Sequence, residues 1–261
     1  MATGVQTKRE TSPAAPPATP PVAAQPAVAP DEFERDFQRF KELSDRAGRR
    51  MPLRWEDRRP CLGERTEGCA FDRHYVYHTA WAARVLAILK PKLHVDISSS
   101  LYFSAIASAF VPVDYYEYRP VKLTLDNFRS RTADLLALPF RDRSVPSISC
   151  MHAVEHVGLG RYGDPLDAEG DLKAMAELQR VVAPGGSLIF VVPVGKPRVA
   201  FNAHRIYGFG HILDAFEELE LEQFAVVPDG RTGMPLLVNP PDGLADAQSY
   251  GCGCFWFRRP S

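Results

Sequence analysis

The 261-residue sequence lacks both long hydrophobic runs and an excess of charge. No apolar stretch approaches the roughly 20 residues that a membrane-spanning helix needs. The N-terminus also has no apolar core of the secretory type. Lysine and arginine number 31 against 32 aspartates and glutamates, so the formal net charge is −1. This balance gives no reason to expect nucleic acid or an anionic membrane as a partner.

Cysteine is also scarce. The five cysteines are an odd number and are mostly scattered, at positions 61, 69, 150, 252 and 254. A disulfide framework is therefore not expected, and a reducing cytoplasm is the compartment that fits. Cys252 and Cys254 lie two residues apart, which places both side chains on one face of a strand. Two thiols alone are a weak signal for a metal, and a packed strand is the simpler interpretation.

The first thirty residues contain no aromatic side chain, but they hold seven prolines and eight alanines. Such a segment cannot bury enough apolar surface to offset its ordering entropy, so residues 1–30 are predicted to be a disordered tail. Residues 31–70 are predicted to form an N-terminal helix, with Asp31 as its cap, followed by an irregular cover. The globular domain is expected over residues 71–261.

Strand-like and helix-like segments alternate through this domain. Strands are predicted at residues 93–97, 111–114, 131–133, 145–151, 187–192, 224–228 and 251–258. Helices are predicted at 101–110, 168–182 and 211–222 between them. This alternation favours an α/β fold with a doubly wound parallel sheet, in which ligands bind at the carboxyl ends of the strands. The last two strands should form a closing antiparallel hairpin.

The segment from Ala133 to Gly163 carries the strongest motif. Asp134-Leu-Leu-Ala-Leu-Pro139-Phe140 precedes a buried strand, which ends in His152-Ala-Val-Glu155-His156. The pattern resembles the central segment of class I S-adenosylmethionine (SAM)-dependent methyltransferases, over about residues 71–259. The resemblance implies a Rossmann-like, seven-stranded, mostly parallel sheet with one antiparallel strand near the edge. The run EHVGLGRYGD at 155–164 resembles a narrower bacterial family with a methyltransferase-like fold.

The resemblance also implies a SAM site. Asp96 keeps the acidic position at the end of the first strand, but Ser98, Ser99 and Ser100 stand where the superfamily has a glycine loop. Glycine normally allows a tight turn and a close backbone approach to the cofactor. Serines can still cap the following helix. Because the glycines are missing, the alternative interpretation is a capped turn that binds no ligand.

Three further positions complete the cofactor site that the resemblance implies. Asp114, at the predicted end of the second strand, is the first candidate to bind the ribose hydroxyls, because a carboxylate accepts two hydrogen bonds. Glu117 is the reserve candidate. Asp134 matches the position that contacts the adenine amino group, and Leu135 would supply a backbone N–H.

His152, Glu155 and His156 are the candidate catalytic residues. An imidazole could take a proton from a hydroxyl acceptor, because its pKa lies near neutrality. The alternative is structural: Glu155 and His156 would hold the loop and helix ends together. The spacing H-x-x-E-H also matches a zinc pattern, which needs a helix through both histidines. His74 and His78, four residues apart, have the spacing of helical metal ligands or pack against the domain.

These observations predict a SAM-dependent methyltransferase that acts on a hydroxyl of a small molecule or saccharide. The cofactor would carry the reactive methyl group, while the protein aligns donor and acceptor and removes a proton. The alternative from the missing glycine loop is a non-catalytic binding or scaffold protein with the same fold. A metal hydrolase built on His152, Glu155 and His156 is the third hypothesis.

Overall fold

A computed structural model describes residues 29–63, 71–230 and 234–261. The chain divides into two compact units, one up to Phe71 and the other from Asp72 to Ser261. The predicted disordered tail lies outside the described residues, except for Ala29 and Pro30. Within the described residues, no helix combines the length and apolar character needed to cross a membrane.

The first unit contains helix α1 (Pro30–Arg46) and the short 3-10 helix η1 (Trp55–Asp57). The predicted helix is present, but Asp31 is not its cap. Ala29 occupies the N-cap position and Pro30 begins the helix, where its missing N–H costs nothing. Asp31 instead accepts a hydrogen bond from Arg35 at 2.9 Å.

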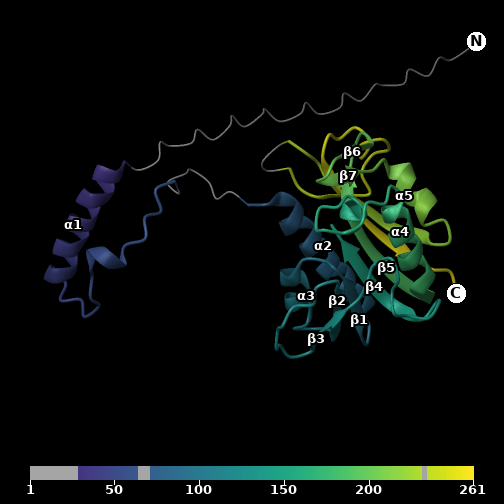
Figure 1. Cartoon of the computed structure of the whole chain (residues 1–261), viewed down its shortest axis with the longest axis horizontal. Helices are drawn as coiled ribbons and strands as arrows, with labels where there is room; N and C mark the ends of the chain where they lie inside the picture. Colours follow the sequence, from purple (N-terminus) through teal and green to yellow (C-terminus); the bar gives the residue numbers. More distant parts are fainter. Residues whose placement is uncertain (1–28, 64–70, 231–233) are drawn as a thin grey trace, which may run out of the picture. The chain divides into compact units, whose positions relative to one another are not determined.

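The second unit holds one large sheet with helices on both faces (Figure 1). Its helices are α2 (Arg73–Leu89), α3 (Leu101–Ala107), η2 (Val154–His156), α4 (Gly170–Val181) and α5 (Phe209–Ala215). The strands of the sheet are β1 (His94–Ile97), β2 (Val113–Glu117), β3 (Phe128–Thr132), β4 (Val145–Met151), β5 (Val182–Val194), β8 (Glu220–Val227), β9 (Leu237–Val238) and β10 (Gly251–Arg258). A separate ribbon pairs β6 (Arg198–Ala200) with β7 (His204–Ile206).

The strand order is β3-β2-β1-β4-β5-β10-β8-β9. Strands β1 to β5 run parallel, and β10 is antiparallel to both β5 and β8. The predicted doubly wound α/β fold with its closing hairpin is therefore confirmed. The predicted number of seven strands is wrong by one, because the two-residue strand β9 pairs with β8 at the edge. The sequence 237–238 is too short to be recognised as a strand by its pattern.

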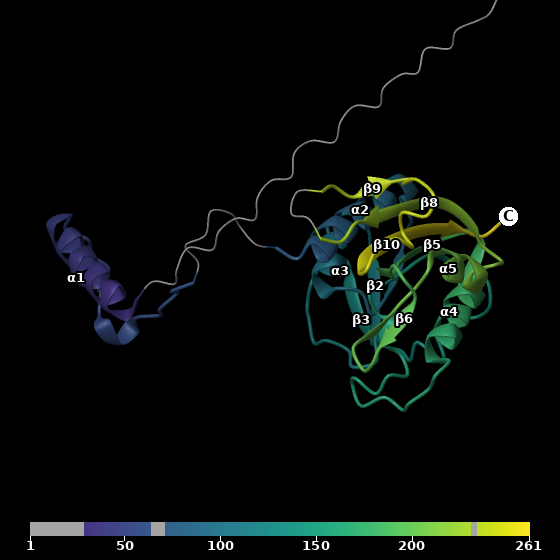
Figure 2. The ribbon, with the colours of Figure 1, turned by 90° about the horizontal axis from the view of Figure 1, so that it is seen from above.

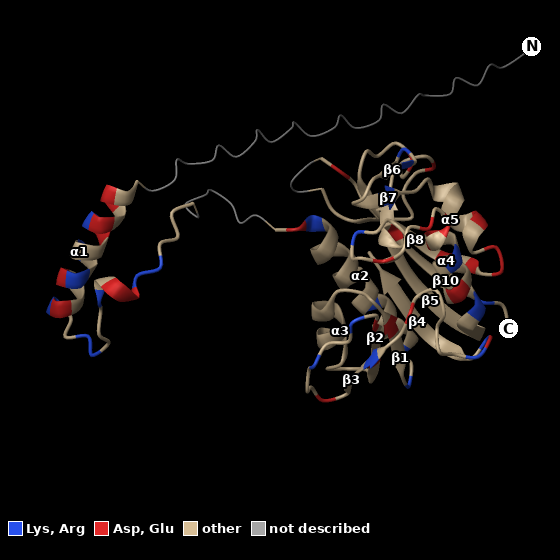
Figure 3. Ribbon diagram, viewed as in Figure 1, with Lys and Arg blue, Asp and Glu red and all other residues tan. Residues whose placement is uncertain are grey.

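Two apolar layers fix the helices to the sheet. Helices α2 and α3 contribute Trp81, Val85 and Phe103 to one layer, while α4 and α5 contribute Leu178 and Ile212 to the other. Figure 2 shows these helix pairs on opposite sides of β5 and β10. The central strand β5 carries no charged side chain, as a strand buried on both faces requires (Figure 3).

Several element boundaries differ from the sequence prediction; strand β3, for example, begins at Phe128 rather than at 131. Strand β2 begins two residues later than expected and continues to Glu117, so its carboxyl end moves by three residues. The predicted helix at 211–222 is shorter, because α5 ends at Ala215 and Glu220 already begins β8. The Pro-Gly-Gly segment after α4 belongs to the start of β5, and Gly185 takes a φ of 68° there.

Candidate active site

The carboxyl ends of β1 to β4 meet at one edge of the sheet. Ile97, the last residue of β1, is level with Tyr116 on β2 and with Cys150 on β4. Glu117 is level with Thr132, the last residue of β3. The segments that follow these strands are therefore neighbours, although up to fifty residues separate them in the sequence.

The triple serine forms a left-handed turn after β1. Ser98 has a φ of 54°, and its N–H donates to the carbonyl of Tyr116 at 2.8 Å. The Oγ of buried Ser99 accepts a hydrogen bond from the Met151 N–H at 3.1 Å. Ser100 is the N-cap residue of α3, but its side chain makes no capping hydrogen bond. The turn thus has the conformation that favours glycine, although no glycine is present.

We expect Ser98→Gly to raise the free energy of unfolding. A left-handed residue with a Cβ costs about 1–2 kcal/mol, and the greater entropy of unfolded glycine offsets about 0.5–1 kcal/mol of the gain. The net increase should therefore be up to about 1 kcal/mol. Urea unfolding checks it, with Ser98→Val as the matched variant that should lose stability. A lower urea midpoint for Ser98→Gly would contradict the prediction.

Asp96 lies in a fully buried polar network rather than on the site surface. Ser104 and Ser149 donate hydrogen bonds to its two carboxylate oxygens, the latter at 3.0 Å. Ser149 in turn contacts His94 Nε2 at 2.9 Å, and Ser147 contacts His94 Nδ1 at 2.8 Å. Burial raises the pKa of Asp96 to about 6, against the opposing effect of these hydrogen bonds. Asp96 therefore stabilises the turn through its hydrogen bonds with Ser99.

The structure corrects the position of Asp114. It is the second residue of β2 and pairs with Arg129 at 2.5 Å and Arg131 at 3.7 Å, so it does not end the strand. The reserve candidate, Glu117, lies at the carboxyl end of β2. Its Oε1 accepts the N–H of Tyr118 at 2.9 Å, and the residue is half-buried. Glu117 is thus the carboxylate next to the Ser98 turn.

Asp134 and Leu135 follow β3 in a closed turn. The Asp134 carboxylate accepts the Leu136 N–H at 2.9 Å, and its carbonyl accepts the Ala137 N–H at 3.0 Å. Asp134 is exposed, while Leu135 packs partly against the core. Both residues lie at the same sheet edge as Glu117.

His152 and Glu155 form a buried pair after β4. His152 has a φ of 54°, and its Nδ1 lies 2.8 Å from Glu155 Oε1. The other nitrogen, Nε2, lies 3.4 Å from the sulfur of Cys252. Burial lowers the pKa of His152, but Cys252 and the Glu155 carboxylate outweigh that effect and raise it above the usual value. The H-x-x-E-H zinc pattern fails here, because a left-handed turn and a three-residue 3-10 helix replace the required helix.

His156 is held in a different way. Its Nδ1 lies 2.7 Å from the carbonyl of Ala203, which requires the proton on Nδ1 and leaves a lone pair on Nε2. That nitrogen lies 3.9 Å from Glu155 Oε1, and the side chain is 16% exposed. Of the two histidines, only His156 therefore combines a free nitrogen with access to solvent.

The glycine-rich loop after His156 is organised by Asp164. Its carboxylate accepts the N–H groups of Gly158, Gly160 and Tyr162 at 2.9–3.2 Å. Gly158 has a φ of 78°, and a Cβ there would lie 2.2 Å from the Asp167 carbonyl oxygen. Glycine is therefore required at this position, and the loop has a defined shape beside His156.

An aromatic and histidine cluster extends along this edge, and the sequence alone did not assemble it. The ring of His152 lies 6.0 Å from His74 and 5.0 Å from His78. Tyr250 lies 5.2 Å from His74 and 4.8 Å from His204. No sequence spacing connects His204 or Tyr250 with these histidines. Their assembly depends on the pairing of β10 with β5.

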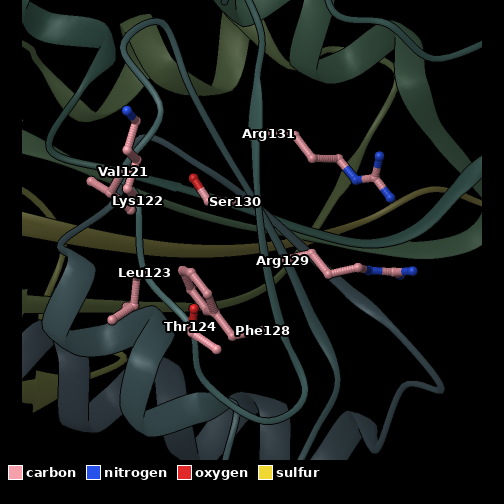
Figure 4. Close-up of a pocket in the computed structure, with 8 residues that line it drawn as sticks. All are labelled: Val121, Lys122, Leu123, Thr124, Phe128, Arg129, Ser130 and Arg131. Atoms are coloured by element: carbon pink, nitrogen blue, oxygen red, sulfur yellow. The ribbon is translucent and has the colours of Figure 1, made fainter.

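A hollow of about 530 Å³ lies elsewhere, along the edge strand β3 and the segment 121–124 (Figure 4). Arg129 and Arg131 project to one side of the strand there, and Ser130 to the other. Both arginines already pair with Asp114. The carboxylates and imidazoles that could bind a ligand or transfer a proton lie instead at the carboxyl ends of β1 to β4. We take this edge as the candidate active site.

Comparison with known proteins gives one partial family match. Residues 121–221 match the model of a family described as a Caenorhabditis protein of unknown function, DUF268. No match was found among curated proteins. The matched segment begins shortly after β2 and ends at the second residue of β8, and it includes the candidate catalytic residues.

Solved structures share the fold of the whole second unit. A 1,6-didemethyltoxoflavin-N1-methyltransferase from Burkholderia thailandensis, solved with that compound and S-adenosylhomocysteine, is 13% identical, with a TM-score of 0.51 and coverage of 92% of this chain and 94% of that one. A protein of Bacillus halodurans assigned as a methyltransferase is 16% identical, with a TM-score of 0.50 and coverage of 70% and 99%. A Haloferax volcanii protein, solved in complex with the Trm112 methyltransferase activator, is 17% identical, with a TM-score of 0.50 and coverage of 88% and 97%. The chain therefore has the Rossmann-like methyltransferase fold.

Proposed function

We propose that this protein is a SAM-dependent methyltransferase that methylates a hydroxyl of a small molecule or saccharide. The sulfonium of SAM supplies an electrophilic methyl group when bound. The observation that carries the proposal is the convergence of a left-handed turn, a carboxylate and a histidine at one sheet edge. These groups belong to Ser98, Glu117 and His156.

The residues at this edge fit such a cofactor. The turn at Ser98 lets backbone N–H groups approach a ligand, as the usual glycine would. The Glu117 carboxylate accepts the Tyr118 N–H and interacts with the Tyr115 hydroxyl, and since a carboxylate has about four acceptor positions it can also accept from a ribose hydroxyl. Asp134 and the backbone N–H of Leu135 would bind the adenine ring. Asp96 and Ser99 would support the turn through their internal hydrogen bonds.

His156 would remove the acceptor proton. Its tautomer is fixed by the Ala203 carbonyl, so the Nε2 lone pair is available without rotation of the ring. The Glu155 carboxylate, 3.9 Å from Nε2, would stabilise the imidazolium that forms. His152 is a weaker candidate for the base, because both of its nitrogens already have partners. Its pair with Glu155 would position the loop.

Calorimetric titration of the full chain with SAM and S-adenosylhomocysteine tests the cofactor site. Glu117→Gln should weaken binding about 10- to 100-fold, because one charge-assisted hydrogen bond is worth about 1.5–3 kcal/mol. Asp114→Asn is the matched control and should leave affinity unchanged, since its carboxylate pairs with Arg129 and Arg131. Wild-type protein that binds neither ligand at millimolar concentration would overturn the proposal. A non-catalytic module with a degenerate cofactor loop would then be the better description.

A further inference from the structure

Three side chains from distant parts of the chain place metal-binding atoms together beside the candidate base. His74 comes from the first turn of α2, His152 follows β4, and Cys252 is the second residue of β10. One ring nitrogen of each histidine and the cysteine sulfur all lie within 4.8 Å of one another. His152 and Cys252 are buried, and His74 is half-buried, so the cluster can be reached from one side.

The surrounding hydrogen bonds fix the rings of two histidines at the cluster, and one of them, His152, is a candidate ligand. Glu155 accepts from Nδ1 of His152, so the Nε2 proton is the one that metal binding would displace, and the lone pair that it leaves is directed at the Cys252 sulfur, 3.4 Å away. A carboxylate behind a histidine in this way is the usual support of a metal ligand. His78 is held similarly, since its Nδ1 lies 2.6 Å from the His74 carbonyl oxygen.

Two buried polar atoms at this cluster have no hydrogen-bond partner. They are Nε2 of His78, whose residue is fully buried, and the second carboxylate oxygen of Glu155, which is 1% exposed. A buried polar atom without a partner costs about 1–3 kcal/mol, so its presence needs an explanation. The ring of His78 lies 5.0 Å from that of His152, but His78 is not among the residues whose ligand atoms lie within 4.8 Å of one another. A bound cation would explain why two imidazoles and one thiol gather at this place.

The separations suit a tetrahedral ion. Zinc binds nitrogen at about 2.0 Å and sulfur at about 2.3 Å, so a nitrogen and a sulfur on one zinc lie about 3.5 Å apart. The 3.4 Å between His152 Nε2 and Cys252 Sγ is close to this value. The His74 nitrogen lies within 4.8 Å of both atoms, so a shift of its ring toward them would complete the set. Two imidazoles and one thiolate are a ligand set that zinc favours over magnesium or calcium.

The same atoms allow a second interpretation, in which Cys252 is a nucleophile activated by His152 and oriented by Glu155. A nucleophile must contact its substrate, however, and Cys252 is fully buried in the strand between β5 and β8. Coordination to a metal does not need the sulfur to reach solvent.

The geometry points to a Zn²⁺ site formed by His74, His152 and Cys252, with Glu155 as the support of His152. The thiol of Cys252 would lose its proton to solvent as the Zn–S bond forms, so binding should release a proton. Three protein ligands leave a fourth position, as in sites where zinc binds a further molecule. This inference concerns metal binding alone and does not rest on the proposed methyl transfer.

The experiment is equilibrium dialysis of the full chain, first stripped with a chelator and then titrated with Zn²⁺. Wild-type protein should bind one Zn²⁺ per chain. His74→Gln, His152→Gln and Cys252→Ser should each weaken binding at least 100-fold, and Glu155→Gln should weaken it about 10- to 100-fold, as expected for a supporting partner. Cys150→Ser and His204→Gln are matched controls, because they alter a buried cysteine and a nearby histidine outside the ligand set.

Cobalt substitution supplies a readout that a folding defect would not imitate. The Co²⁺ form should show a thiolate-to-cobalt charge-transfer band that disappears in Cys252→Ser, while the intense d–d bands of a tetrahedral site weaken in His74→Gln. His74 is half-buried, so His74→Gln should remain folded by circular dichroism even if the buried variants do not. Less than stoichiometric zinc in wild-type protein would overturn the site, as would equal affinity in His74→Gln. Rapid alkylation of Cys252 that depends on His152 in metal-free protein would favour the nucleophile instead.

Discussion

Replacing His156 by alanine is expected to lower the turnover number by about 10²- to 10⁴-fold, the usual contribution of a general base. The reason is local: Nε2 of His156 is the free imidazole nitrogen beside the Glu155 carboxylate, and Ala203 fixes its tautomer. Affinity for S-adenosylhomocysteine should change by less than about two- to three-fold, because a base contacts the acceptor and not the cofactor. Production of S-adenosylhomocysteine from SAM, with hydroxyl acceptors identified by screening, measures the rate.

The matched control is His211→Ala, because His211 is exposed on α5 and lies outside the candidate site. Its turnover should equal that of the wild type. Added imidazole should restore part of the activity to His156→Ala. It should restore none to Glu117→Gln, which lacks the carboxylate proposed to bind the cofactor. Unchanged turnover in His156→Ala would remove the assignment of the base, while leaving the cofactor test intact.

Much of the site edge could be predicted from the sequence because it depends on local patterns. Strand β4 runs from Val145 to Met151, as its short apolar run predicts, and His152 follows it directly. The mostly parallel, doubly wound sheet follows from the alternation of strands and helices. These features need only the hydrophobic period and the turn residues on either side of each segment.

The end of β2 illustrates why a boundary can be misjudged. Asp114 looks like the end of a strand, because a carboxylate inside a parallel sheet is unusual. In the structure Arg129 and Arg131, on the neighbouring strand β3, neutralise it, so the strand can continue through two tyrosines to Glu117. The sequence shows both arginines, but not that they lie level with Asp114 and Tyr116.

The histidine and cysteine cluster could not be predicted for a related reason. His74, His152 and Cys252 are 78 and 100 residues apart in sequence, so no spacing pattern connects them. Only the register of β10 against β5, with Cys252 level with Pro193, brings the sulfur to the carboxyl edge. Each pair that the sequence did suggest, such as Cys252 with Cys254, shares only one member with the cluster.

The buried histidine at the start of β1, His94, is expected to make stability depend on pH. Burial lowers the pKa of His94 from 6.5 to about 3, because the fully buried ring cannot be charged without losing solvation. The unfolded chain therefore binds a proton below pH 6.5 that the folded chain does not. Stability from His94 is complete above pH 6.5 and is lost as the pH falls toward 3, with a loss of about 2 kcal/mol by pH 5.

Asp96, in the same network, acts in the opposite direction. Its folded pKa of about 6 lies above the unfolded value of 3.8, so its contribution is complete below pH 3.8 and is lost as the pH rises through 6. Acidification from pH 7 to 5 thus raises the contribution of Asp96 to the free energy of unfolding by about 1 kcal/mol. The two residues share Ser149 as a hydrogen-bond partner, yet their titrations partly cancel.

Urea unfolding at pH 5, 6 and 7, with a chelator present so that no metal contributes, separates the two effects. His94→Asn should reduce the fall in stability between pH 7 and 5 by about 2 kcal/mol, whatever its stability at pH 7. Asp96→Asn should steepen the fall by about 1 kcal/mol, because it removes the opposing titration. An identical pH dependence in wild type and His94→Asn would mean that the imidazole takes up its proton in the folded state, through opening of the layer between β1, β4 and α3. The turn at Ser98, which is connected to His94 through Ser149 and Asp96, would then share that mobility. A preformed cofactor site at this turn would not be expected.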